Sequence, residues 1–293
     1  MKESAGLTYR SHYWDDRSAK GAFKEFLVSL FGLDLGLWDA GGFWDEQYMP
    51  FSLFDEDRIV SSVCLYSMEM TIGGKRRRVG QFSAVATLPS FRRRGLARRL
   101  TEKAVEWASD THEGFFLFAS DEAVPFYARC GFSPIRETAD TLVIDPPPRR
   151  DGLRKLDMGS DRDIERVHEI ASERAPVSDT LGALNPKLLM FHCLYALRDC
   201  VYEVADLDTV VLFKPERGRL VLFDVIGRRV PPFAELYPYL AREPHEEILF
   251  LFMTDKMGIE PTGKRTMKEN NAHIDPAFPL PGPRCLFPYA SRA

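Results

Sequence analysis

Residues 85–100 constrain the fold of this chain more than any other stretch. The run Val85–Leu88 is short and apolar, as in a buried strand, and a basic turn that ends at Gly95 follows it. Beyond the turn, apolar side chains recur at helical spacing: Leu96, Leu100, Ala104, Trp107 and Ala108. The start of a helix has unpaired backbone amides, and its dipole favours negative charge. The sequence therefore predicts a site for an anion, such as a pyrophosphate, at this turn.

The turn does not follow the other common phosphate-binding motifs. Neither G-x-x-x-x-G-K-[ST] nor G-x-G-x-x-G occurs in it; instead, Leu88-Pro89 leads into Arg92-x-x-Gly95-x-Ala97. A second motif, Phe126-Tyr127-x-x-x-Gly131-Phe132, lies downstream, after a short apolar run at 115–119 that reads as a buried strand. Pro125 suits the first turn of a short helix, and Gly131 suits the position just past its end.

Together, the two motifs resemble motifs A and B of the Gcn5-related N-acetyltransferases (GNAT). The resemblance implies that acetyl-CoA donates an acetyl group to an amine, and that Tyr127 is the general acid for the leaving thiolate. It also implies that the main chain before the turn pairs with the pantetheine arm. The residues expected to bind the cofactor are Val85, Ala86, Thr87, Arg92, Arg93, Arg94, Gly95, Leu96, Ala97, Arg98 and Asp121, with Glu122 beside them.

Each feature has a simpler explanation when it is taken alone. A basic run such as Arg92–Arg94 is usually a solvated loop, and a tyrosine such as Tyr127 on a short helix usually packs half buried. The order of strand, turn, helix, strand and second motif favours the catalytic interpretation. Two alternatives stay open: a non-catalytic acyl-CoA sensor or scaffold, and a protein-lysine or N-terminal acetyltransferase.

Residues 33–48 follow an expected helix at 16–31 and are rich in aromatic rings and carboxylates. In the resembled family this region often forms one wall of the acceptor site, and such residues would suit a cationic amine. A surface helix or loop anchored by Trp38 and Trp44 explains the same composition. We expect the acceptor site between the two halves of the chain. The general base is not identified, and Glu46 and Glu69 are candidates.

A linker is expected at residues 145–152, where three prolines and a glycine interrupt the pattern. The length of 293 residues fits two domains, at 1–146 and 147–293. The expected elements of the second half repeat the order of the first, with Arg219–Val225 in the place of the cofactor strand. The next residues, 227–232, lack the R-x-x-G-x-A pattern and include two prolines, which have no amide hydrogen.

We therefore expect an α/β (α+β) fold of two tandem GNAT-like domains, each with a mixed, mostly antiparallel sheet flanked by helices. The first domain would hold the acetyl-CoA site, and the second would be degenerate. This plan resembles the enhanced intracellular survival acetyltransferases, without their C-terminal sterol-carrier-like domain. The apolar tail at 279–290 is expected to pack across a domain surface. A C-terminal carboxylate that reaches the acceptor cleft is an alternative for the chain end.

Composition excludes several classes of partner. The net charge of -4 gives no argument for nucleic-acid binding, and the basic run Lys75–Arg78 is expected to be a charged hairpin turn. No apolar run is long enough to span a membrane, and no signal-peptide core is present. Five cysteines without C-x-x-C, and six histidines without ligand spacing, predict neither a disulfide framework nor a metal site. A reduced, cytoplasmic protein is expected, with a homo-oligomer possible.

Overall fold

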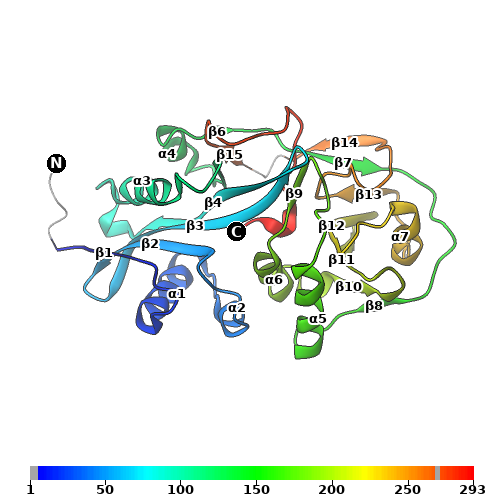
Figure 1. Cartoon of the computed structure of the whole chain (residues 1–293), viewed down its shortest axis with the longest axis horizontal. Coiled ribbons are helices and arrows are strands. Elements are labelled where there is room, and N and C mark those ends of the chain that lie inside the picture. The colour runs from blue at the N-terminus through cyan, green and yellow to red at the C-terminus, as the bar shows by residue number, and fades with distance from the viewer. Residues whose placement is uncertain (1–5, 268–270) are drawn as a thin grey trace.

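The computed structural model describes residues 6–267 and 271–293 and arranges them around two β-sheets that lie side by side (Figure 1). The first sheet has the strand order β1-β2-β3-β4-β5-β15-β6, and β9 pairs with β3. Its strands are β1 (Thr8–Ser11), β2 (Tyr48–Asp55), β3 (Arg58–Ile72), β4 (Lys75–Thr87), β5 (Phe115–Phe118), β6 (Ser133–Pro134), β9 (Leu181–Ala183) and β15 (Ala272–Ile274).

Helices cover both faces of the first sheet (Figure 1). On one face lie α1 (Arg17–Phe31) and α2 (Gly36–Ala40), and on the other lie α3 (Leu96–Ala108) and α4 (Val124–Arg129). The carboxylate of Asp16 caps α1 by accepting hydrogen bonds from two amides of its first turn, and Gly32 ends this helix with a left-handed backbone. The apolar faces of α1 and α3 pack on the sheet and form its core.

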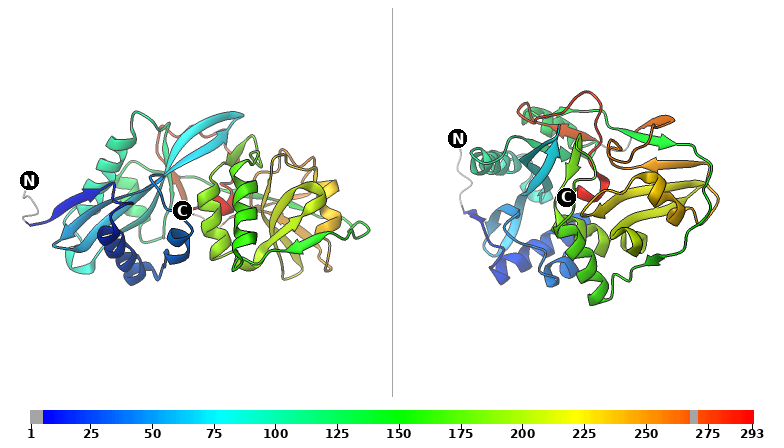
Figure 2. Two further views of the ribbon diagram at one scale, coloured as in Figure 1. Left: turned by 60° about the horizontal axis from the view of Figure 1, so that its bottom comes forward. Right: turned by 45° about the vertical axis from the view of Figure 1, so that its right-hand side comes forward.

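The second sheet has the order β14-β7-β13-β12-β11-β10-β8. Its strands are β7 (Thr138–Leu142), β8 (Leu153–Lys155), β10 (Val201–Val204), β11 (Thr209–Glu216), β12 (Arg219–Gly227), β13 (Glu247–Phe250) and β14 (Gly263–Thr266). Its helices are α5 (Asp161–Ser172), α6 (Pro186–Leu194) and α7 (Phe233–Leu240), and short 3-10 turns occur at Pro89–Phe91, Arg198–Cys200, Ala205–Leu207 and Tyr289–Ser291. Figure 2 shows α5 and α6 at the junction between the sheets.

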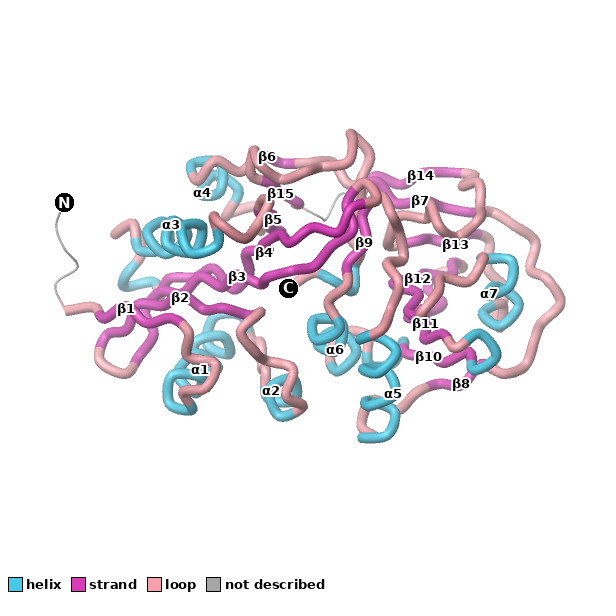
Figure 3. The backbone as a smooth tube through the Cα atoms, viewed as in Figure 1, coloured by secondary structure: helices cyan, strands magenta, loops and turns pink. Residues whose placement is uncertain are grey.

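The two halves of the chain exchange strands: the first half contributes β7 to the second sheet, and the second half contributes β9 and β15 to the first. β7 precedes the linker, yet it pairs with β13 and β14. β15 comes near the end of the chain, yet it pairs with β5 and β6 (Figure 3). The division into 1–146 and 147–293 stays a prediction, and it does not include this exchange of strands.

One strand pair in each sheet is parallel. β4 pairs with β5 through 80–82, and β12 pairs with β13 through 219–222. The other paired strands of the described residues are antiparallel. This confirms the expected fold class of mixed, mostly antiparallel sheets in a tandem arrangement.

The basic run Lys75–Arg78 is not a turn, and this expectation was wrong. Gly73 and Gly74 form the turn, with φ of 57° and 74°, and β4 begins at Lys75 opposite Ile72. Glycine accepts a positive φ without steric cost, so two consecutive glycines confine the turn to themselves. The basic side chains that follow therefore stand on a strand.

Candidate active site

The predicted anion site lies where β4 leads into α3. Gly95, with φ of 75°, precedes the helix, and no side chain caps the first turn. Within the described residues, the amides of 93–98 donate no hydrogen bond to the protein. The start of α3 therefore offers free donors at the positive end of the helix dipole.

The arginines of the turn are fixed by local contacts. Arg92 Nε donates to the carbonyl of Thr87 at 3.1 Å, and Arg94 Nη2 donates to the carbonyl of Ser90 at 2.9 Å. The Arg94 guanidinium also stacks on Phe91, 4.8 Å from the ring centroid. These contacts use only part of each guanidinium, so both arginines keep donors for an anion.

A pocket of about 330 Å³ opens at this turn. It is lined by Thr87, Phe91, Arg92, Arg93, Gly95, Leu96, Ala97, Arg98, Phe126, Arg129 and Cys130. Seven of the predicted cofactor residues are among them, whereas Val85, Ala86, Arg94 and Asp121 are not. Arg129 and Cys130 were missed by the sequence analysis. Their spacing of three and four residues from Phe126 along α4 puts them on one helix face, and this signal could have identified them.

β4 separates from β5 just before the turn. The pairing ends at Phe82, and residues 83–87 have no described partner strand on that side. On the other side they follow β3 through an irregular register, where Ala84 has a φ of 48°. One edge of this half-buried segment therefore presents backbone amides and carbonyls that an extended ligand can pair with. Val85, Ala86 and Thr87, the predicted partners of the pantetheine arm, lie in it.

Tyr127 is buried on α4, near the point where the two strands separate. Its ring centroid lies 5.1 Å from that of Phe126 and 6.2 Å from that of Phe132. Phe132 in turn lies 5.7 Å from Phe82, the last paired residue of β4. Burial, with a smaller effect of Cys130, raises the pKa of the Tyr127 phenol above its usual value of 10.0. The phenol therefore stays protonated at neutral pH.

The exchanged strand reaches the same region. Asp121 accepts a hydrogen bond from the side chain of Asn271, which directly precedes β15. Asp121 and Glu122 are both exposed and line neither the pocket at the turn nor the pocket between the halves.

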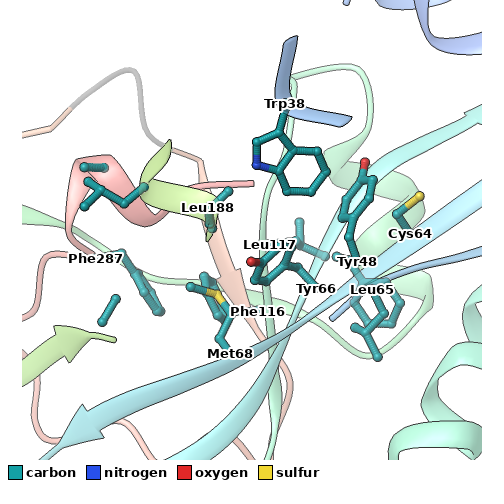
Figure 4. Close-up of a cluster of buried hydrophobic side chains, with 14 of the residues drawn as sticks. Trp38, Tyr48, Cys64, Leu65, Tyr66, Met68, Phe116, Leu117, Leu188 and Phe287 are labelled. Carbon is teal, nitrogen blue, oxygen red and sulfur yellow. The ribbon is translucent and has the colours of Figure 1, made fainter. Parts of the chain in front are cut away.

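A second pocket, of about 280 Å³, lies between the two halves of the chain. Figure 4 shows Trp38, Tyr48, Tyr66 and Leu188 around this space. The full lining is Phe31, Leu33, Leu35, Trp38, Tyr48, Tyr66, Ser83, Ala84, Leu188, Phe191 and Ala293. Ser83 and Ala84 belong to the separated part of β4, so the pocket reaches the strand that leads to the anion site.

The carboxylates of residues 33–48, which the sequence analysis grouped with these rings, do not line this pocket. Asp39 forms ion pairs with Lys20 and Lys24, and Asp45 forms one with Lys187. Burial alone would raise the pKa of Asp39, but the hydrogen bonds from the two lysines hold it below its usual value.

The two candidate bases do not line the pocket between the halves either. Glu69 pairs with Arg76 at 3.2 Å on the long hairpin, and Glu46 is exposed.

The corresponding strand–helix junction of the second half is arranged differently. After β12, Arg228 forms ion pairs with Asp208 and Glu173. The amide of Phe233, the first residue of α7, already donates to the carbonyl of Met257 at 2.8 Å. Pro231 and Pro232 have no amide hydrogen to offer. Within the described residues, the first turn of α7 therefore offers fewer free amides than the first turn of α3.

Comparisons with known proteins agree with this geometry. Residues 50–135 match the model of the acetyltransferase (GNAT) domain family. No curated protein matches the sequence. Among solved structures, the chain is similar to Eis1 from Mycobacterium abscessus, with a TM-score of 0.58 and 16% identity over 92% of this chain and 73% of that one.

Two further structures share the fold. A GCN5-related N-acetyltransferase from Kribbella flavida has a TM-score of 0.55 and 13% identity, over 93% of this chain and 72% of that one. A probable N-acyltransferase from Enterococcus faecalis has a TM-score of 0.58 and 13% identity, over 92% and 72%. Residues 50–135 therefore match the acetyltransferase (GNAT) domain family, and the chain as a whole shares the fold of these solved structures.

Proposed function

We propose that this protein is an N-acetyltransferase that moves an acetyl group from acetyl-CoA to an amine by direct attack. The observation that carries the proposal is the set of free amides at the start of α3, next to the unpaired edge of β4. Residues 92–98 would bind the diphosphate, and 85–87 would pair with the pantetheine arm. Both parts suit a long ligand with an anionic and an amide-rich portion.

Tyr127 is proposed as the general acid. A thiolate leaves when an amine attacks a thioester, and a nearby phenol can supply its proton. Because burial raises its pKa, Tyr127 holds this proton across the working pH range. Backbone amides of the separated strand could donate to the carbonyl oxygen as it gains charge.

The pocket between the halves is proposed as the acceptor site. It meets β4 at Ser83 and Ala84, beside the strand edge proposed for the pantetheine arm. Small amines and the amine of a peptide are both possible acceptors, and we propose no nucleic-acid or membrane partner. The helices within 6–267 and 271–293 are all too short or too polar to cross a bilayer. The five cysteines are free, which supports a cytoplasmic location.

The test is thiol release from acetyl-CoA with a panel of amines, accompanied by mass analysis of the products. The proposal predicts stoichiometric free thiol and an acetylated amine for at least one acceptor. Binding of acetyl-CoA without thiol release from any amine would favour the alternative, a non-catalytic acyl-CoA sensor. Acetylation of peptides alone would favour a protein-lysine or N-terminal acetyltransferase.

A further inference from the structure

The pocket between the halves has an apolar wall. Aliphatic and aromatic side chains supply most of the lining, and none of the described lining side chains carries a formal charge. The one anionic group of the described lining is the main-chain carboxylate of Ala293. The rings of Trp38 and Tyr48 lie 5.5 Å apart, nearly perpendicular, and those of Tyr48 and Tyr66 lie 6.0 Å apart. Such a wall binds apolar surface and aromatic rings through burial and edge-to-face contact.

Two acidic side chains close in sequence to the wall already form ion pairs. Asp39 is held by two lysines, and Asp45 is held by Lys187 of α6. One ammonium group of a polycationic acceptor could pair with the Ala293 carboxylate, but its remaining ammonium groups would have no charged partner in the described lining, and burial of an unpaired charge is costly. An amine with a single nitrogen and an apolar body meets no such cost.

One polar atom marks the end of the pocket at β4. Ser83 Oγ is buried beside the Tyr48 hydroxyl, but no hydrogen bond of good geometry reaches it among the described residues. Ser83 is also the first residue of β4 beyond the pairing with β5. A buried polar atom without a partner indicates a missing donor or acceptor. An amine N–H at this position would donate to Ser83 Oγ and would stand beside the strand edge proposed for the thioester arm.

The pocket opens to solvent beside Phe31, which is 50% exposed although it lines the cavity. Val28 lies one turn earlier on α1 and is exposed to the same extent. Exposed apolar side chains at a pocket mouth are typical of a site that binds an apolar ligand. The mouth of the pocket is therefore apolar, as its wall is.

On this basis, and resting on the proposed function, we propose that the acceptor is a primary monoamine with an aromatic or branched alkyl body. The body packs against Trp38 and Leu188, and the nitrogen lies at Ser83. The nitrogen forms a bond to the acetyl carbonyl carbon, the carbon–sulfur bond breaks, and sulfur leaves with the electron pair. The amine proton passes to water, Tyr127 protonates the sulfur, and water returns a proton to Tyr127. The products are an N-alkyl acetamide and free CoA.

The experiment compares phenethylamine, spermidine and a lysine peptide as acceptors with the full chain and acetyl-CoA, and measures thiol release. We expect kcat/KM for phenethylamine to exceed the other two by at least about tenfold, the scale of one lost apolar contact or one unpaired group. Equal or better turnover of spermidine or the peptide would overturn the inference and leave the proposed function intact. No thiol with any amine, despite calorimetric uptake of acetyl-CoA, would overturn both.

Two variants and one matched control test where the acceptor amine binds. Leu33→Glu introduces a charge at a half-buried lining position. We expect kcat/KM for phenethylamine to fall about tenfold, and the preference for phenethylamine over spermidine to become smaller. Leu37→Glu is the control, because Leu37 is 52% exposed on the same segment and does not line the pocket. Ser83→Ala should raise KM for phenethylamine about tenfold with unchanged uptake of acetyl-CoA. Equal effects of Leu33→Glu and Leu37→Glu, or none of Ser83→Ala, would contradict the assigned pose.

Discussion

The indole N–H of Trp38 donates to the main-chain carbonyl of Lys187 at 2.7 Å. This hydrogen bond joins α2 of the first half to α6 of the second. Both helices supply lining residues of the pocket between the halves, so the bond holds two of its walls together. The proposed acceptor site thus depends on the contact between the halves.

We expect Trp38→Phe to weaken this contact and to raise KM for the acceptor. The substitution keeps an aromatic ring but leaves the carbonyl of Lys187 without its donor, which costs about 1–2 kcal/mol of unfolding free energy. Steady-state kinetics and denaturant unfolding measure the two effects. Trp107→Phe is the control, because Trp107 is partly exposed on α3 and lines neither pocket. Similar changes in both variants would argue against a specific role for Trp38.

Gly95→Ala should impair acetyl-CoA binding more than its effect on stability explains. An added Cβ at Gly95 meets no atom within 4 Å, but φ is 75°, so alanine costs about 1 kcal/mol of strain. Gly218→Ala is a matched control, with φ of 77° and equally open space, in a hairpin of the second sheet. The two variants should lose similar stability, and only Gly95→Ala should weaken binding in calorimetry. Unchanged binding in Gly95→Ala would remove the turn from the proposed site.

Tyr127→Phe should lower kcat by about a hundredfold or more, as expected when a general acid is lost. The ring contacts with Phe126 and Phe132 do not need the hydroxyl group, so the affinity for acetyl-CoA should be nearly unchanged. Tyr237→Phe in α7 provides a buried control in the second half. Unaltered kcat in Tyr127→Phe would exclude this residue as the acid.

Stability should fall as the pH decreases from 6.5 to 4, and His192 should cause part of the fall. Its Nε2–H donates to the carbonyl of Arg292 at 2.8 Å, and its Nδ1 is buried without a partner among the described residues. Burial lowers the pKa of this imidazole from 6.5 to about 4. In this range the unfolded chain binds a proton that the folded protein does not, so up to about 3 kcal/mol is lost.

His192→Gln separates this contribution, because glutamine can still donate to the carbonyl of Arg292 but does not titrate. Denaturant unfolding at several pH values gives the unfolding free energy as a function of pH. Between pH 6.5 and 4, the slope of this function should be smaller in the variant than in the wild type, by nearly the contribution of one bound proton. Above pH 7, the unfolding free energies of the variant and the wild type should change with pH in nearly the same way. A slope identical to that of the wild type would show that His192 does not carry the effect.

Much of the first half could be predicted from sequence. The helix at 96–108 and the strand at 115–118 followed from clear periodicity and an apolar run. The apolar run from Pro186 to Arg198 predicts one helix, but α6 ends at Leu194, residues 195–197 form a turn, and a separate 3-10 turn begins at Arg198. Ends of helices are set by local competition between backbone hydrogen bonds, which periodicity does not show.

The exchanged strands and the ion pairs could not be predicted. β15 has three residues and β7 has five, and each finds its partner strands across a long stretch of chain. Strands this short carry little periodic signal, and their position depends on tertiary pairing. The pairing of Asp39 with Lys20 and Lys24 is likewise tertiary. It is the reason that carboxylates expected to face an acceptor amine do not do so.

The most direct test of the central claim is calorimetric titration of the full chain with acetyl-CoA and with acetyl-pantetheine, which lacks the nucleotide diphosphate. If the free amides and arginines of residues 92–98 bind the diphosphate, acetyl-CoA should bind, more weakly as salt increases, and acetyl-pantetheine should bind far less tightly. Equal affinity for the two compounds, or no heat of binding with acetyl-CoA, would contradict the account.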